Sequence, residues 1–255
     1  MRILVTNDDG WDSPGILALA DVLSSFATVE VVAPDENRSA SSNSLTVGCP
    51  IAVTHGRQGY HAVHGTPSDS VHVAVTALLP WRPDLVVSGI NDGQNLGEDT
   101  VYSGTVGAAL ESFLYNIPAV AFSLVDRGWH HLDSAAKVAA DIVLQVYGKM
   151  PSPWLLNVNI PNRPYHELSG YQVTRLGRRN PSPGVLFDET NDGHEAYRIG
   201  PYGTIMDDGE GTDFYALNCG LVSVTPLQVD WTYYEGMKNL SSIFGDGIKL
   251  SKDAR

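Results

Sequence analysis

Two adjacent aspartates, Asp8 and Asp9, stand directly after the first apolar segment of the chain, and Gly10 follows them. Neighbouring carboxylates repel each other and resist removal from water, so a buried pair needs a compensating charge. One interpretation is a surface turn, because Asp and Gly are common in turns. The other is a divalent cation at the end of a buried strand, which would need further oxygen donors nearby.

Polar segments also follow later apolar segments, at residues 35–44, 91–105 and 125–130. Ser39 lies in the first of them, and Asn91 and Asn95 lie in the second. Carboxylate, hydroxyl and amide oxygens are hard donors, which Mg²⁺, Mn²⁺ or Ca²⁺ prefer and Zn²⁺ does not. Magnesium keeps waters and substrate phosphate oxygens in its shell, so few protein ligands suffice. Together these segments favour a metal site over a simple turn.

An anion site is predicted at Ser103, Gly104 and Thr105, which stand at the start of a predicted helix. Free backbone N–H groups and the positive end of the helix dipole attract phosphate there. Gly104 allows close approach, and the two hydroxyls can donate hydrogen bonds. Plain helix capping with nothing bound explains the same residues. The long polar segment before them is harder to explain as a mere connection.

Apolar segments alternate with helical patterns, which predicts an α/β fold with a mostly parallel, Rossmann-like sheet flanked by helices. The predicted strands are residues 2–6, 28–34, 83–90, 117–124 and 154–161. The predicted helices are residues 14–26, 66–79, 105–116 and 132–148. Short alternating segments at 45–47, 51–55 and 60–65 predict a hairpin after the second strand. In such sheets ligands bind beyond the carboxyl ends of the strands, where the polar segments begin.

The chain changes character after residue 165. Residues 170–177 and 214–227 are strand-like, and a long polar stretch at 178–212 separates them. Such a stretch is usually functional or an interaction arm, and we expect an extended hairpin that reaches another subunit. We expect a single domain over residues 1–255. Its predicted parts are a core over about residues 1–165 and a strand-rich region with a projecting arm and tail over about 166–255.

Composition excludes several classes of protein. The formal net charge of −13, with no lysine before Lys137, argues against binding a nucleic-acid polymer. No run of eighteen apolar residues is present, which argues against a membrane span, and no signal peptide pattern follows Met1, so the cytoplasm is expected. The absence of GxxxxGK[ST], GxGxxG and GxSxG excludes P-loop, dinucleotide-binding and nucleophile-elbow sites.

Five motifs in order along the chain resemble the SurE family, the stationary-phase survival proteins. They are NDDG (7–10), VVAPDENRSASSNSLT (31–46), GTPSDSV (65–71), SGINDGQNLGEDTVYSGTVGAALE (88–111) and GTDFYALNCGLVSVTPL (211–227). The resemblance spans residues 1 to about 230 and implies a metal-dependent 5′-nucleotidase, a phosphoric monoester hydrolase acting on nucleoside 5′-monophosphates. It also implies a dimer or tetramer, assembled through an arm at residues 178–200 and an exchanged C-terminal tail.

The resemblance further implies one divalent metal ion per subunit, Mg²⁺ or Mn²⁺. The implied metal ligands are Asp8, Asp9, Ser39 and Asn91. The implied phosphate-binding residues are Asn95, Ser103, Gly104 and Thr105. In the expected mechanism Asp8 or Asp9 orients a metal-bound water or takes its proton.

Several alternatives remain compatible with these residues. An aspartyl-phosphate formed on Asp8 would replace direct attack by water. A broad acid phosphatase, an exopolyphosphatase or a non-catalytic nucleotide and metal sensor would use the same groups. Trp11, Tyr102 and Trp129 are candidates for stacking on a base, although lone aromatic residues more often pack.

Overall fold

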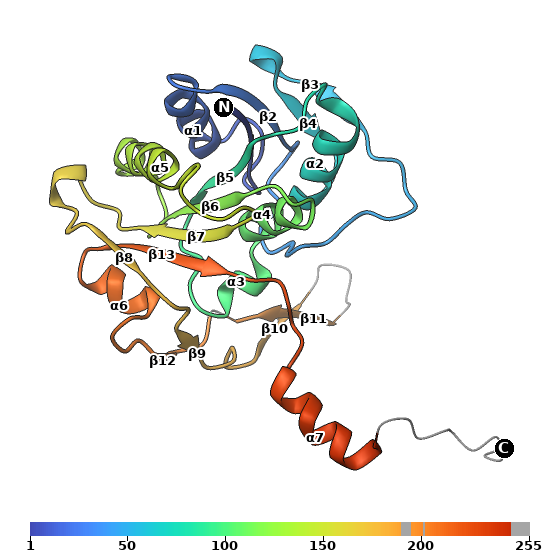
Figure 1. The fold of residues 1–255 in the computed structure, drawn as a ribbon, viewed down its shortest axis with the longest axis vertical. Coiled ribbons are helices and arrows are strands. Elements are labelled where there is room, and N and C mark those ends of the chain that lie inside the picture. Colours follow the sequence, from blue (N-terminus) through green and yellow to red (C-terminus); the bar gives the residue numbers. More distant parts are fainter. Residues whose placement is uncertain (190–194, 201, 246–255) are drawn as a thin grey trace.

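A computed structural model describes residues 1–189, 195–200 and 202–245. One sheet has the strand order β3-β4-β2-β1-β5-β6-β7-β13-β8 (Figure 1). Its strands are β1 (Arg2–Thr6), β2 (Thr28–Pro34), β3 (Val53–His55), β4 (His61–Val63), β5 (Leu85–Asp92), β6 (Ala119–Leu124), β7 (Leu155–Ile160), β8 (Tyr171–Val173) and β13 (Val222–Leu227). Neighbours pair in parallel except β3 with β4 and β7 with β13. The predicted α/β fold with a mostly parallel sheet is therefore confirmed.

Helices cover both faces of this sheet (Figure 1). The helices are α1 (Pro14–Ser24), α2 (Pro67–Val73), α3 (Asp99–Tyr102), α4 (Gly104–Leu114), α5 (Leu132–Val146) and α6 (Asp213–Asn218), with short η1 (Arg57–Gly59), η2 (Ala74–Leu78) and η3 (Tyr165–Glu167). A further helix, α7 (Tyr234–Phe244), projects away from the sheet (Figure 1). Ile3 and Val5 of β1 pack with α1 and α5, whereas Leu4 packs with α2 and α4. Residues 3–5 of the strand are all apolar because both of its faces are covered.

The order of strands reverses beside β1, which pairs with β2 on one edge and with β5 on the other. Parallel strands end at the same edge of a sheet, so the segments that follow β1, β5 and β6 start side by side. Open α/β sheets bind ligands at such a reversal. The polar segment with Asp8 and the one with Asn95 therefore begin at neighbouring positions.

Two local predictions of secondary structure are wrong. Residues 214–227 are not strand-like throughout, because α6 precedes β13. Thr212 caps α6 by accepting a hydrogen bond from the Tyr215 N–H at 3.1 Å. Residues 45–47 form no strand, since the Thr46 N–H and hydroxyl both donate to the Asp69 carboxylate. In both places a local polar contact outweighs the alternation of apolar residues.

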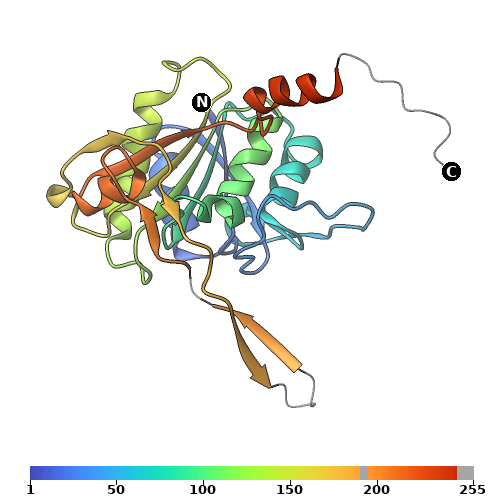
Figure 2. The same ribbon diagram turned by 90° about the horizontal axis from the view of Figure 1, so that it is seen from below.

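The polar stretch after residue 178 forms two antiparallel pairs. β9 (Arg178–Arg179) pairs with β12 (Ile205–Asp207), and β10 (Val185–Glu189) pairs with β11 (Glu195–Ile199). Figure 2 shows the β10–β11 hairpin projecting away from the sheet and its helices. The hairpin is confirmed, while residues 190–194 of the arm and 246–255 of the tail lie outside the described residues. Contact with another subunit and the single-domain assignment stay predictions.

None of the helices in the described ranges is both long and apolar enough to cross a membrane.

Candidate metal and phosphate site

A cavity of about 400 Å³ lies at the carboxyl ends of β1 and β5. The predicted site residues that line it are Asp8, Ser39, Asn91, Asn95 and Ser103. The other three contact lining residues. Gly104 and Thr105 pack on Asp8, and Asp9 accepts a hydrogen bond from the backbone of Asp92. Folding therefore gathers all eight predicted residues around one cavity.

The N-terminus of α4 is packed directly on the Asp8 carboxylate, which is 3% exposed. The Thr105 hydroxyl donates to Asp8 Oδ1 at 2.5 Å. A Cβ added at Gly104 would lie 2.8 Å from Asp8 Cβ and 3.0 Å from Asp8 Oδ2. Burial raises the pKa of Asp8, and hydrogen bonds from the Thr105 hydroxyl and nearby backbone N–H groups lower it in part. Only a residue without a side chain fits at position 104.

The two hydroxyls predicted to hold phosphate have partners within the protein. Thr105 donates to Asp8, while Ser103 Oγ accepts from the Val106 N–H at 3.1 Å and caps α4. Ser103 still lines the cavity, and Thr105 is fully buried. Thr105 is thus placed to orient a carboxylate, and Ser103 to cap the helix that faces the cavity.

Asp9 carries the second carboxylate and is partly exposed. Burial and the neighbouring Asp8 charge raise the pKa of Asp9 to about 6. Its two oxygens accept hydrogen bonds from Asn37 Nδ2 at 3.1 Å and from the Asp92 N–H at 3.2 Å. Two crowded carboxylates that both have a raised pKa are typical of a site that is stabilised by a bound cation.

The remaining candidate ligands are neutral oxygen donors. The Arg38 N–H donates to the Asp8 carbonyl at 2.7 Å and holds the segment that carries Ser39 against β1. Asn91 Nδ2 donates to the Gly93 carbonyl at 2.8 Å, so its amide oxygen is the end available to a cation. Among the described residues, no three His, Cys, Asp or Glu side chains cluster as metal ligands. Two carboxylates completed by neutral oxygens and water fit Mg²⁺ or Mn²⁺.

Ser41 places a further hydroxyl oxygen, a candidate metal or phosphate contact, near Asp8. Its Oγ is buried and finds no hydrogen-bond partner among the described residues. A Cβ at Gly104 would come within 2.8 Å of this oxygen as well as of Asp8. The sequence marks Ser41 only as one of several serines in its segment, so nothing local distinguished it. An unpartnered buried hydroxyl at this point supports a polar ligand in the site.

Asn95 is held by polar side chains from within the sheet. Its Nδ2 donates to Ser123 Oγ at 2.8 Å, and its N–H donates to Asn159 Oδ1 at 2.8 Å. The amides of Asn157 and Asn159 donate to the Asn95 carbonyl at 2.9 and 3.0 Å. Sequence reasoning missed this pair, although two asparagines at a spacing of two in the apolar LLNVNI strand were a signal. They fix the loop that brings Asn95 to the cavity.

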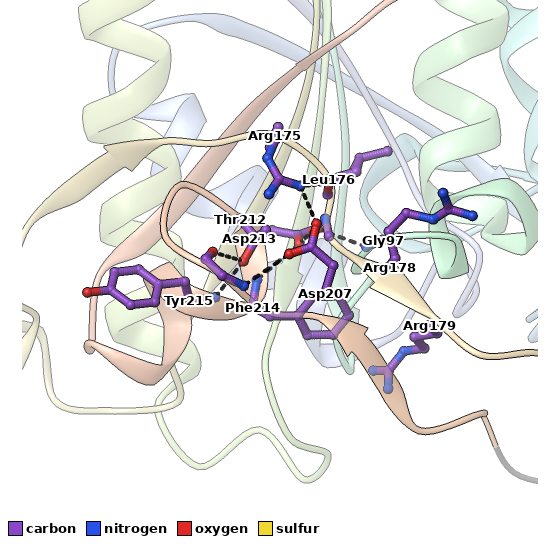
Figure 3. A network of polar contacts seen from close by, with 12 residues as sticks. Gly97, Arg175, Leu176, Arg178, Arg179, Asp207, Thr212, Asp213, Phe214 and Tyr215 are labelled. Atoms are coloured by element: carbon purple, nitrogen blue, oxygen red, sulfur yellow. Dashed lines mark hydrogen bonds and ion pairs between the residues drawn. The ribbon is translucent and has the colours of Figure 1, made fainter.

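A second anchor holds the same loop from the C-terminal region (Figure 3). Asp213 is fully buried and accepts hydrogen bonds from the N–H groups of Gly97 at 2.8 Å, Gly177 at 2.8 Å and Phe214 at 3.0 Å. Burial raises the pKa of Asp213, and these backbone bonds lower it in part. The carboxylate therefore ties the cavity loop to the segment that leads into the arm.

Ion pairs extend this anchor along β9. Arg178 Nε lies 2.8 Å from Glu98 Oε1, and Arg179 Nε lies 2.9 Å from Asp99 Oδ2. The Arg179 guanidinium stacks over Tyr202 and Phe214, at 5.5 and 4.8 Å from their ring centroids. Sequence reasoning missed these residues because their partners lie about 80 positions away in the chain.

Of the three aromatic residues that are candidates for stacking on a base, two pack within the protein and one lines the cavity. Trp129 packs against Gly15, and Trp11 against Gly56, away from the cavity. Tyr102 lines the cavity, and so does Tyr202, which lies after the arm. Both rings are 64% exposed, so each presents a face that a planar ligand can reach.

Comparison with known proteins identifies the family to which this chain belongs. A family model described as "Survival protein SurE" matches residues 3–183. The chain belongs to the SurE family. Among solved structures, the crystal structure of SurE protein from Aquifex aeolicus is 42% identical, covers 95% of this chain and 99% of that chain, and superposes with a TM-score of 0.84. SurE membership supports a metal-dependent phosphatase or nucleotidase at the level of the family. The resemblance inferred from the sequence motifs is confirmed.

Gly104→Ala is expected to weaken both the SurE fold and its metal site. The added methyl would overlap Asp8 and Ser41, so the carboxylate must move. Overpacking of this kind lowers the free energy of unfolding by about 1–3 kcal/mol. Urea unfolding and a Mn²⁺ titration would measure the two effects, with the exposed α5 variant Gln145→Ala as the control. Wild-type metal affinity in Gly104→Ala would contradict the placement of Asp8 as a ligand.

Asp9→Asn is expected to stabilise the metal-free protein at neutral pH. The pKa of about 6 exceeds the ordinary value of 3.8, so the folded chain binds more protons between these values. The contribution of Asp9 to stability therefore falls as pH rises from about 4 to 6, and the full cost applies above pH 6. Two pKa units correspond to roughly 3 kcal/mol, which partial exposure reduces to about 1–2 kcal/mol.

Urea unfolding in EDTA at pH 5 and pH 7.5 would measure this effect. The gain of Asp9→Asn over wild type should be larger at pH 7.5. A gain that does not change with pH would contradict the raised pKa of Asp9, which burial and the Asp8 charge cause.

Proposed function

We propose that this protein is a divalent-metal-dependent 5′-nucleotidase that hydrolyses nucleoside 5′-monophosphates to nucleoside and phosphate. One observation carries the proposal: Asp8 and Asp9 are crowded together at the end of β1, and Asp8 lines a cavity with Ser39, Asn91 and the α4 N-terminus. Membership of the SurE family supports the same class of reaction. The rings of Tyr102 and Tyr202 at the cavity support a substrate with a planar base, since bases stack on aromatic rings.

Asp8, Asp9, Ser39 and Asn91 would hold one Mg²⁺ or Mn²⁺ ion per subunit. When bound, the ion supplies a Lewis acid for a phosphoryl oxygen and a water of lowered pKa. Asp8 is held in one orientation by the Thr105 hydroxyl. Asp9 is partly exposed and accepts hydrogen bonds from Asn37 Nδ2 and the Asp92 N–H, and Asp8 or Asp9 would orient the attacking water or take its proton. The N-terminus of α4 stabilises negative charge on the phosphoryl oxygens.

Attack by water is the proposed route, with an aspartyl-phosphate on Asp8 as the competitor. The burial of Asp8 and its bond from Thr105 support a fixed orienting role over that of a mobile nucleophile. A single turnover quenched in acid, followed by mass analysis of the peptide that contains Asp8, separates the two. A phosphoryl group on Asp8 would contradict direct attack by water.

Phosphate release from a panel of substrates tests the proposed function. The panel contains nucleoside monophosphates, p-nitrophenyl phosphate and polyphosphate, each with Mg²⁺, Mn²⁺ or EDTA. Metal-dependent release that is fastest from nucleoside monophosphates is the expected result. Preference for polyphosphate or the generic ester would favour an exopolyphosphatase or a broad acid phosphatase. Binding of metal and nucleotide without any release would favour a non-catalytic sensor.

We also infer that the protein forms a homodimer or homotetramer through its arm and tail. The β10–β11 hairpin and α7 both project from the body in Figure 2. Their exposed apolar side chains include Leu186, Phe187, Ile199, Leu240 and Ile243. Exposed apolar residues grouped on projecting elements are typical of interfaces. Light scattering that gave the 27.5 kDa mass of one chain at micromolar concentration would contradict this inference. The cytoplasmic location stays a prediction.

A further inference from the structure

Arg127 is an exposed residue at the cavity, in the segment that follows β6. Both of its neighbours are tied to the loop that follows β5. The Asp126 N–H donates to Gln94 Oε1 at 3.2 Å, and the Gly128 N–H donates to Asp92 Oδ1 at 2.8 Å. Gly128 has a φ of +110°, a conformation that other residues rarely adopt. The backbone of Arg127 is thus held against the cavity loop while its side chain lines the cavity.

The guanidinium of Arg127 is not paired with another side chain in the described residues. Within the described ranges it makes no hydrogen bond and no ion pair, whereas Arg38 and Arg179 are paired with carboxylates. Its side chain passes over Gly93, where an added Cβ would lie 3.8 Å from Arg127 Cγ and 3.9 Å from Nε. Its charge also acts on Asp9 and lowers the pKa of that carboxyl in part. An exposed arginine whose backbone is held at the cavity has N–H donors available to a ligand.

The charge around the cavity shows which ligand this arginine fits. The lining carboxylates are Asp8, Asp92, Asp99 and Asp126. Among the lining residues that the structure describes, Arg127 is the cationic one. A phosphate monoester carries up to two negative charges, and the carboxylates repel it. A metal ion offsets the charge of Asp8 and Asp9, and a guanidinium offers paired N–H donors that match two phosphoryl oxygens.

We propose that Arg127 is a catalytic residue that binds two non-bridging oxygens of the substrate phosphoryl group; this rests on the proposed phosphomonoesterase function. As the water oxygen bonds to phosphorus, the bond from phosphorus to the ester oxygen breaks, and its electron pair leaves with the nucleoside oxygen, which takes a proton. Arg127 stays protonated throughout. Its contribution is to stabilise the charge that the phosphoryl oxygens carry in the transition state.

Arg127→Gln and Arg127→Lys test this assignment, with Lys149→Gln as a control for net charge on an exposed residue after α5. Steady-state kinetics with a nucleoside monophosphate and Mg²⁺ would give kcat and KM. Arg127→Gln is expected to lower kcat/KM by about 10²–10³-fold. Arg127→Lys should recover part of the loss, because it restores the charge without the paired donors. Lys149→Gln should match wild type.

Two binding measurements separate a phosphate contact from a structural role. Calorimetry with inorganic phosphate in the presence of Mg²⁺ should show binding to Arg127→Gln weakened by at least tenfold. Titration with Mn²⁺ alone should show affinity that is unchanged or tighter, since a nearby positive charge has been removed. Phosphate affinity and kcat/KM both within twofold of wild type would overturn the proposal, as would a loss of metal affinity.

These outcomes are distinguishable from failure of the proposed function itself. If wild type releases no phosphate from any ester, the phosphomonoesterase is wrong, and phosphate calorimetry still decides whether Arg127 binds the anion. If wild type turns over substrate and Arg127→Gln does so equally well, only the role of Arg127 is wrong.

Discussion

Asp8→Asn is expected to lower metal-dependent phosphate release by at least about 10²–10³-fold, the scale on which loss of one electrostatic contact in a reaction site acts. Asp8 is the most buried of the proposed ligands and the one on which the α4 N-terminus packs. An amide at this position removes the negative charge that attracts the cation. Its size is nearly unchanged, so the cavity and the contact with Gly104 are kept.

The same variant should lose affinity for Mn²⁺, measured by titration calorimetry at pH 7.5. Asp12→Asn is the matched control, because Asp12 follows in the same segment, is exposed and does not line the cavity. Its activity should equal that of wild type. If Asp8→Asn kept both its metal affinity and its turnover, the proposed metal centre would have to lie elsewhere.

Asp213→Ala is expected to produce the largest loss of stability among the single substitutions considered. The change would leave three buried backbone N–H groups, those of Gly97, Gly177 and Phe214, without their acceptor. Each unsatisfied buried donor costs about 1–3 kcal/mol, and water entering the space offsets part of this, so a total of roughly 3–5 kcal/mol is expected. Urea unfolding followed by circular dichroism would measure it.

Asp213→Asn should give an intermediate result, because one oxygen remains and the other is replaced by an amide nitrogen that faces an N–H. If that nitrogen faces Gly97, the loop that carries Asn95 loses one of its two anchors, and phosphate release should fall while much of the fold is kept. Asp208→Asn is the control, since Asp208 is exposed in the same region. An unfolding midpoint for Asp213→Ala equal to that of the control would contradict the anchoring role.

The order of elements over residues 2–161 could be predicted because each is a local pattern. Residues 3–5 of β1 are all apolar because helices cover both faces of the strand, and Pro14 and Pro67 mark the first residues of α1 and α2. The meeting of Asp8 with Asn91 could also be predicted. In a parallel sheet the carboxyl ends of the strands share one edge, so both residues were expected at that edge, and the strand order then makes β1 and β5 neighbours.

Local patterns were less informative where a short polar contact decided the structure. Alternating residues in 214–227 favoured a strand, yet the Thr212 cap begins a helix there. Phosphate binding by Ser103 and Thr105 stays a prediction, and what spacing did not report is that each hydroxyl also contacts the protein. A hydroxyl takes whichever partner lies within hydrogen-bond distance after folding, and sequence spacing does not report that distance.

By itself, then, the sequence determined the α/β class, the edge of the sheet that carries the site and the hard-oxygen character of its ligands, because periodicity and residue type are local properties. Only the tertiary structure decided what holds the site in place. Asn159 and Asp213 anchor the cavity loop across 64 and 116 positions of the chain, and Arg127 reaches the cavity because its neighbours bond to Asp92 and Gln94. Such contacts depend on which distant segments the packed sheet and helices bring within about 3 Å of one another.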